Sequence, residues 1–179
     1  PVVTGFIGKT GQGEVTTLGR GGSDYSAAIF GAALNAEEIQ VWTDVDGVMT
    51  ADPRIVPNAR TVDAVSFEEA SELAYFGAKV LHPKTILPAL NKNIPVRVLN
   101  SFNPSGTGTL ILKNVTRNEH VTAITSKSDI YVININSARM LLAYGFLHRV
   151  FKLFDEFRIP VGMIATSEVN VTVTVEDKF

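Results

Sequence analysis

Short apolar runs alternate with polar stretches along the whole chain, and this pattern predicts strands and helices in turn. Strands are predicted at residues 2–7, 38–43, 94–99, 109–112, 130–135, 161–165 and 169–175. Polar sequence predicts a loop or hairpin over 10–24 and a long loop over 43–57. The alternation indicates an α/β protein.

Helices are marked by their end signals. Ser23 or Asp24 can cap a helix that runs to about Asn35. Ser66 and Glu69 have the spacing of a capping box, which opens a second helix ending near residue 76.

Two more helices complete the pattern. Pro83 suits the first turn of a helix that we expect to end near residues 91–93. Residues 145–157 carry apolar side chains at helical spacing.

A polar stretch divides the chain into two units. Residues 114–120 are predicted to link a first unit, 1–113, to a second unit, 121–179. The second unit has the order β-α-β-β, which is two-thirds of a ferredoxin-like β-α-β-β-α-β motif. Because both ends of the chain fall at predicted strands, we expect a fragment of a longer protein.

Composition excludes several functional classes. Sixteen Lys and Arg against eighteen Asp and Glu give a net charge of −2, without a basic block, which argues against nucleic acid and anionic membranes as partners. No apolar run approaches the ~18 residues of a membrane span. The absence of cysteine excludes disulfides, thiolate zinc sites and a Cys nucleophile, and fits a cytoplasmic location.

Spacing excludes two familiar motifs. Gly8-Lys9-Thr10 is not a P-loop, because Val3 stands where the first glycine is required. Residues 44–47 are not part of a calcium loop either. Such a loop has glycine at its sixth position, so Gly47 would put Trp42 at the first position, where an oxygen ligand is required.

Three polar segments are candidates for chemistry. Residues 17–24 place glycines and Arg20 before a helix, where an anion can bind, although a simple capped helix fits equally well. Residues 42–54 follow a strand, and ligands of α/β sheets bind beyond the carboxyl ends of strands. The same residues could also form an ordinary solvated loop. In residues 76–83, Lys79 could meet a phosphate or remain solvated, and a capping or core role suits His82 better than ligand binding.

Together these segments resemble the aspartate kinase (aspartokinase) family. The matching strings are residues 16–24, 42–45, 51–54 and 76–83. Residues 145–147 and 165–169 resemble the ACT domains that follow the kinase, and the likeness is greatest to the lysine-inhibited, monofunctional type.

The resemblance implies a fold and an activity. The fold is the C-terminal half of an amino-acid-kinase-type αβα sandwich followed by an incomplete ferredoxin-like (ACT) βαββ unit. The activity is phosphorylation of the side-chain carboxylate of L-aspartate by ATP with Mg²⁺. The product, 4-phospho-L-aspartate, opens the route to lysine, threonine and methionine.

The resemblance also implies site residues, and no resident metal site. The aspartate-binding and catalytic residues are Arg20, Ser23 and Asp24. The ATP-binding residues are Thr43, Asp44, Arg54, Lys79 and Val80.

An amino-acid effector, with lysine the first candidate, is expected between the ACT domains of two subunits in a homodimer. The effector residues are Met140, Phe146, Leu147, Val161, Thr166, Ser167 and Glu168. Gly162 stands where lysine-sensing relatives carry an acidic residue, so weaker lysine binding or another amino acid is expected.

Three departures from the family pattern complete the interpretation. The family's Lys-Phe-Gly-Gly motif is absent, so the chain alone is expected to be inactive. Met49 replaces a common Tyr, and Asp46 a common Pro. The alternative function is a non-catalytic, amino-acid-sensing subunit that binds a kinase partner.

Overall fold

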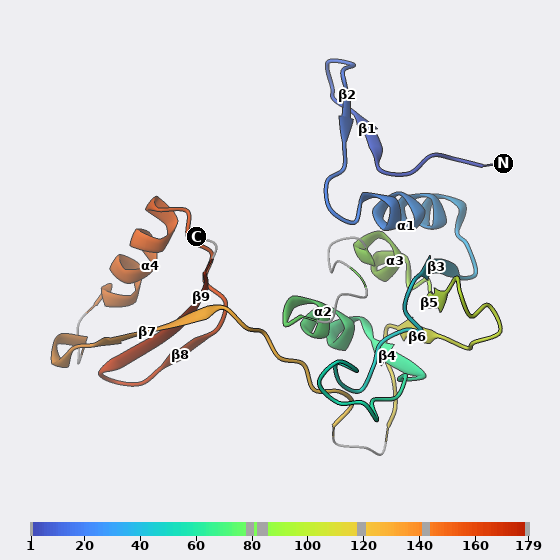
Figure 1. Ribbon diagram of the computed structural model, residues 1–179. Helices are drawn as coiled ribbons and strands as arrows, with labels where there is room; N and C mark the ends of the chain where they lie inside the picture. Colours follow the sequence, from blue (N-terminus) through green and yellow to red (C-terminus); the bar gives the residue numbers. More distant parts are fainter. Residues whose placement is uncertain (1, 78–80, 82–85, 118–120, 141–143, 178–179) are drawn as a thin grey trace. The chain divides into compact units, whose positions relative to one another are not determined.

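The chain forms two compact units, Pro1–Ser126 and Lys127–Phe179, in the computed structural model (Figure 1). The structure describes residues 2–77, 81, 86–117, 121–140 and 144–177. No helix in this described part has both the length and the apolar character needed to cross a membrane.

A mixed four-stranded sheet is the centre of the first unit. Its strands are β3 (Ile39–Thr43), β5 (Val96–Asn100), β6 (Thr109–Leu112) and β4 (Ala64–Ser66), in that order. β3 pairs parallel with β5, β5 antiparallel with β6, and β6 parallel with β4. The carboxyl ends of β3 and β5 therefore lie at one edge of the sheet.

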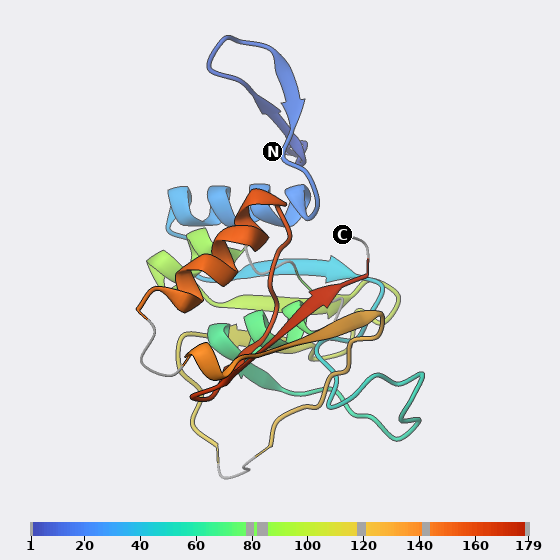
Figure 2. The same ribbon diagram turned by 90° about the vertical axis from the view of Figure 1, so that its left-hand side faces the viewer.

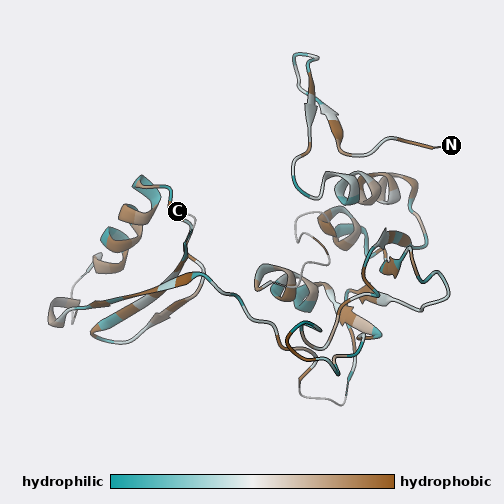
Figure 3. Ribbon diagram, viewed as in Figure 1, coloured by the Kyte–Doolittle hydropathy of each residue, from teal (hydrophilic) through white to brown (hydrophobic). Residues whose placement is uncertain are grey.

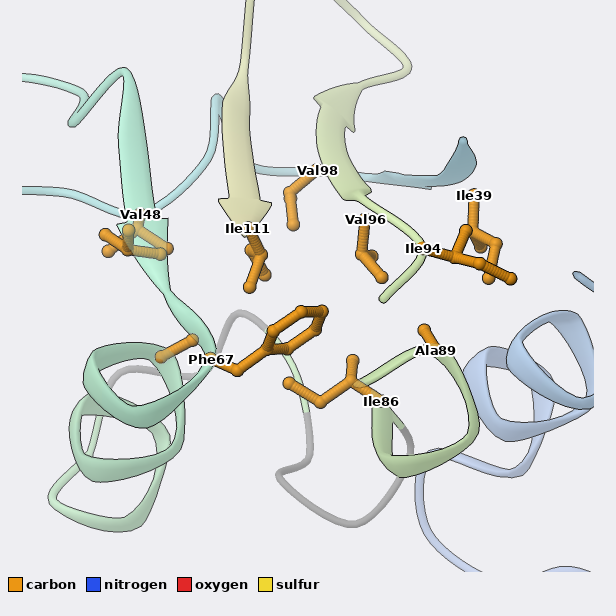
Figure 4. Close-up of a cluster of buried hydrophobic side chains, with 11 residues drawn as sticks. Ile39, Val48, Phe67, Ile86, Ala89, Ile94, Val96, Val98 and Ile111 are labelled. Carbon is orange, nitrogen blue, oxygen red and sulfur yellow. The ribbon is translucent and has the colours of Figure 1, made fainter. Parts of the chain in front are cut away.

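Three helices cover one face of this sheet: α1 (Gly22–Leu34), α2 (Phe67–Tyr75) and α3 (Leu87–Lys92). Figure 4 shows side chains from the strands meeting Phe67 of α2 and Ala89 of α3. The buried cluster consists of Ile39, Val48, Val65, Phe67, Ala70, Ile86, Ala89, Ile94, Val96, Val98 and Ile111. This packing confirms the α/β class.

Local signals set most helix ends. The capping box of α2 is present: the Ser66 hydroxyl accepts from the Glu69 N–H at 3.0 Å, and the Glu69 carboxylate accepts from the Ser66 N–H at 2.7 Å. α1 and α3 end at Asn35 and Asn93, which both adopt the left-handed conformation that asparagine tolerates. Pro83 lies outside the described residues.

The N-terminal region differs from its prediction. The first strand is β1 (Ile7–Lys9), which pairs antiparallel with β2 (Val15–Thr17), so the strand expected over residues 2–7 was wrong. The partner strand reaches only as far as Ile7, and Val2 and Val3 are exposed. α1 begins at Gly22 with Gly21 as its N-cap, so neither expected cap residue occupies the N-cap position.

The second unit confirms the β-α-β-β order. It contains β7 (Ile130–Asn136), α4 (Phe146–Glu156), β8 (Ile164–Thr166) and β9 (Asn170–Glu176), with a short 3-10 helix at Ala138–Met140. The sheet order is β7-β9-β8, antiparallel throughout. β8 starts three residues later than the strand expected there.

α4 is strongly amphipathic, and hydrophobic and hydrophilic bands alternate along its ribbon (Figure 3). Its apolar face lines a groove of about 280 Å³, formed by Ile135, Val150, Leu153, Phe154, Phe157 and Ile159. The valines of β9, Val171, Val173 and Val175, are buried, while the polar residues between them are only partly covered.

The boundary between the units also differs from the expected linker at 114–120. The second unit begins at Lys127. Thr122, Ile124 and Thr125, which were expected in the second unit, form hydrogen bonds with residues of the first.

One buried hydroxyl joins the sheet to the long loop between β3 and β4. Thr109 is 0% exposed, accepts a hydrogen bond from the Val48 N–H at 2.8 Å and donates one to the Val62 carbonyl at 2.7 Å. A Cβ at Gly47 would lie only 2.4 Å from this hydroxyl oxygen. The Thr109 side chain therefore ties the two arms of this loop together at Val48 and Val62.

Thr109→Val should lower the free energy of unfolding of the first unit by about 2–4 kcal/mol, because a buried N–H and a buried carbonyl lose their partner. Chemical denaturation followed by fluorescence of Trp42 reports on this unit, since Trp42 is the sole tryptophan. Thr107→Val, at an exposed position, is the control. Equal stability of the two variants would contradict the role of Thr109.

Candidate functional site

Two of the candidate segments lie at the same edge of the first unit. A short turn after α1 leads directly into β3, so the helix runs antiparallel to the strand. Figure 2 shows the first turn of α1 at the end of the sheet where β3 finishes. The fold thus brings the segment of Arg20, Ser23 and Asp24 to the edge that carries Thr43 and Asp44.

The segment before α1 is shaped by glycines. Gly19 and Gly21 have φ values of 78° and 70°, and the Gly22 N–H bonds the Gly19 carbonyl at 3.0 Å. No side chain caps the first turn of α1. Arg20 and Ser23 are exposed. This end of the helix therefore offers backbone N–H groups, a guanidinium and a hydroxyl to an incoming anion.

Asp24 differs from its neighbours because it is half-buried in the first turn of α1. Burial raises the pKa of its carboxyl above the ordinary value of 3.8. A carboxylate that is held charged in a partly dry place costs the fold stability, and such costs are typical of functional residues.

Hydrogen bonds organise the end of β3. The Thr43 hydroxyl donates to Asp44 Oδ1 at 3.1 Å, and the Thr43 carbonyl accepts from the N–H and hydroxyl of Ser101 at 2.8 and 2.9 Å. Asn100 donates its side-chain N–H to Asp46 Oδ1 at 2.8 Å.

Sequence reasoning missed Asn100 and Ser101 as parts of this edge. Strand register places them there, because Asn100 lies directly opposite Thr43 in the parallel β3–β5 pair and Ser101 follows it.

Arg54 lies farther along the loop, with its side chain 77% exposed. Its guanidinium forms an ion pair with Asp52 at 2.6 Å, and the Arg54 backbone N–H also bonds that carboxylate. Hydrogen bonding to Asp52, and then its negative charge, raise the pKa of Arg54 further, so the group stays charged. Asp52 therefore orients the Arg54 side chain.

Lys79 and Val80 lie outside the described residues, so their predicted role stays a prediction. Among the described residues, no group of three or more His, Asp or Glu side chains could hold a metal ion.

The second unit gathers most of the predicted effector residues at one edge of its sheet. β7 and β8 run in the same direction, so Met140, after β7, and Thr166, at the end of β8, lie at the same edge. The Ser137 N–H bonds the Val169 carbonyl at 2.9 Å and joins the two segments there. At this edge lie Met140, Thr166, Ser167 and Glu168.

Phe146 and Leu147 form the first turn of α4, whose N-cap Gly145 has no side-chain cap. Val161 lies toward the opposite end of β8, beside Gly162, whose N–H bonds the Thr174 carbonyl at 2.8 Å. Sequence reasoning also missed Asn170, whose Oδ1 is buried without a hydrogen-bond partner among the described residues. Asn170 lies two residues after Glu168.

The sequence model of the amino acid kinase family matches residues 1–100. The chain belongs to this family. Among curated amino acid kinases, aspartokinase 2 (chloroplastic) of Arabidopsis thaliana is 50% identical over 178 residues, which cover 98% of this chain and 33% of the relative. The chain thus spans about a third of the length of this and two further curated aspartokinases of Arabidopsis thaliana.

Solved amino acid kinases share the fold. Aspartate kinase of Clostridium acetobutylicum superposes with a TM-score of 0.88 at 36% identity, over 97% of this chain and 41% of its own. Aspartokinase III of Escherichia coli, in complex with aspartate and ADP (R-state), gives 0.81 at 44% identity, over 96% and 38% of the two chains. Its complex with lysine and aspartate (T-state) gives 0.75 at 43% identity, over 96% and 39%.

Asp24→Asn should stabilise the first unit at neutral pH. The folded pKa of Asp24 is raised, so its favourable contribution is complete below pH 3.8 and is lost as the pH rises through the raised value. The stability gained by Asp24→Asn should therefore appear above the raised pKa of Asp24 and vanish below pH 3.8. Denaturation midpoints followed by Trp42 fluorescence between pH 3 and pH 7 measure this difference.

The control is Glu14→Gln, at an exposed carboxylate of the same unit. If wild type and Asp24→Asn differ in denaturation midpoint by the same amount at pH 3 and at pH 7, the raised pKa of Asp24 is contradicted.

Proposed function

We propose that this chain is the part of an aspartokinase that binds ATP and contributes the acceptor segment for L-aspartate, followed by the first part of its regulatory domain. The observation that carries the proposal is the shared edge, where the uncapped start of α1 with half-buried Asp24 lies at the same end of the sheet as Thr43 and Asp44. Half of this chain's residues are identical to those of a plant aspartokinase.

The reaction needs charge neutralisation more than covalent help from the protein. An oxygen of the aspartate side-chain carboxylate attacks the γ-phosphorus of ATP, the bond to the β,γ-bridging oxygen breaks, and ADP leaves with that electron pair. The attacking oxygen carries no proton, so no general base is required. Arg20 would bind a carboxylate of the substrate, and the N–H groups at the start of α1 would favour negative charge beside it.

In this proposal Asp24 orients the groups that surround the transferring phosphoryl group. A half-buried carboxylate can hold lysine ammonium groups around the transferring phosphoryl group, and Ser23 can donate a hydrogen bond to the acceptor. On the donor side, Thr43, Asp44 and Arg54 would bind the nucleotide together with Lys79 and Val80. Mg²⁺ would arrive with ATP, held chiefly by phosphate oxygens and water.

Regulation by an amino acid is the second part of the proposal. The start of α4 suits an α-carboxylate, and Glu168 suits an ammonium group. Because Val161 lies toward the other end of β8, one effector that uses both Val161 and Glu168 would take them from two copies of the chain. This supports a homodimer formed through the ACT units, with lysine as the first candidate effector.

The separate regulatory subunit is the weaker alternative. A subunit of that kind has no need for kinase sequence, whereas the family model covers residues 1–100 of this chain.

Asp24→Ala in the complete enzyme should lower kcat by at least about 100-fold, since electrostatic groups at the reacting centre contribute that much. The KM for ATP should change by less than about threefold, because the donor side is untouched. A coupled assay of ADP release with aspartate measures both constants. The isolated chain should show no turnover, and an unchanged kcat in Asp24→Ala would refute the assigned role.

Glu168→Gln should raise the lysine concentration for half-inhibition about 10- to 100-fold, because a hydrogen bond to a charged group contributes roughly 1.5–3 kcal/mol. Gly162→Asp should lower the lysine concentration for half-inhibition, because the variant adds the carboxylate expected in lysine-sensing relatives. Inhibition is measured with lysine, threonine and methionine in parallel. Glu156→Gln, on the exposed part of α4, is the control; unaltered inhibition in Glu168→Gln would place the effector elsewhere.

A further inference from the structure

Arg117 and residues 121–126, here called the connecting segment, belong to the first unit although they precede the second directly. The segment is not a free linker, because its described residues make contacts at three places in the first unit. Each contact falls beside an end of α2 or on the loop between β3 and β4.

The first contact is made at the start of α2. The Arg117 guanidinium, 16% exposed, pairs with Glu69 Oε1 at 3.0 Å and also donates to the Ala64 carbonyl and the Thr122 hydroxyl. Thr122 in turn donates to Glu69 Oε1 at 2.9 Å. The carboxylate that caps α2 therefore also holds the connecting segment.

Glu69 stays charged in this arrangement. Burial raises the pKa of its carboxyl, but the Ser66 N–H, the Thr122 hydroxyl and the charge of Arg117 outweigh burial and leave the pKa below its ordinary value. At neutral pH the ion pair with Arg117 is intact.

The second contact is made with the loop between β3 and β4. The Ile124 N–H donates to the Thr50 carbonyl at 2.9 Å. Thr50 is itself held across the loop, because its N–H bonds the Arg60 carbonyl at 2.8 Å and its hydroxyl accepts from the Arg60 N–H at 3.0 Å. The connecting segment adds a further backbone partner to this small ladder.

The third contact is made at the end of α2. The Thr125 hydroxyl donates to the Phe76 carbonyl at 3.0 Å. Gly77 has a φ of 120°, and a Cβ there would lie 2.8 Å from the Ser126 carbonyl oxygen. Only glycine allows the two backbones to approach so closely.

These contacts reach two segments that carry predicted nucleotide-binding residues. Thr50 lies in the loop between Asp44 and Arg54, and Gly77 comes two residues before Lys79. We infer that the connecting segment is a positioning element for the nucleotide-binding loops, anchored by Arg117. The inference rests on the proposed function for its link to ATP, and on geometry alone for the anchoring.

Hydrogen exchange of the 179-residue chain tests the anchoring without any activity. Thr125→Val should speed amide exchange about tenfold at residues 121–126 and 76–77 and around Thr50, as expected for the loss of one hydrogen bond that closes a local structure. Arg117→Ala should speed it there by at least as much, because it removes an ion pair together with two further hydrogen bonds. Peptides from β5 and β6 should exchange as before. Thr116→Val, at an exposed threonine of the same stretch, is the control.

Unchanged exchange near Thr50 and Gly77, or equally faster exchange throughout the first unit, would overturn the anchoring. The latter would mean that Arg117 contributes only to global stability.

Steady-state kinetics of the complete enzyme test the link to ATP. Arg117→Ala should raise the KM for ATP about five- to tenfold with kcat within about twofold, because the acceptor groups stay in place. Arg117→Lys, which keeps the charge but loses the planar fork, should recover part of the effect. An unchanged KM for ATP, or a fall in kcat alone, would overturn the inference.

The two tests separate the possible failures. If the complete wild-type enzyme does not phosphorylate aspartate, the proposed function fails, and the exchange result still decides whether Arg117 anchors Thr50 and Gly77.

Discussion

The hydroxyl of Thr109 is the interaction on which the arrangement of the first unit depends. It is fully buried and satisfies a backbone donor and a backbone acceptor from the two sides of one long loop. Without this bridge, Val48 and Val62 would need other partners, and polar groups in an apolar core rarely find them. The loop that carries Asp44, Asp46 and Arg54 is therefore fixed where it leaves the sheet.

Asp24 lowers the stability of the first unit at neutral pH, where its carboxyl is charged. The core of the unit is apolar and well packed, yet Asp24 is held in a half-buried place that disfavours its charged form. Proteins commonly retain such unfavourable groups where activity requires them. The start of α1 also leaves its first N–H groups without a side-chain partner, as the starts of α3 and α4 do.

The features that sequence predicted well are local. The capping box of Ser66 and Glu69, the helix ends at Asn35 and Asn93, and the strands around Val41 and Val98 each depend on a few consecutive residues. The start of α1 was misplaced because Ser23 and Asp24 look like caps, whereas the glycines before them set the turn. Arg20, Asp24 and Thr43 came from a family resemblance, which carries the long-range information that local patterns lack. Thr109, Asn100 and Arg117 were missed because their partners lie 61, 54 and 48 positions away in the chain.

The order of strands in the first sheet has a consequence for synthesis on the ribosome. β3 is made well before its neighbour β5, and α1, α2 and α3 are all complete by the time β5 follows. Pairings between distant segments form slowly, because a long loop must close first. In the nascent chain β3 therefore stays unpaired until Asn100 has emerged, and β4 stays unpaired until its partner β6 ends at Leu112. A chaperone that binds extended segments would find a target in β3, and would release it once β5 arrives.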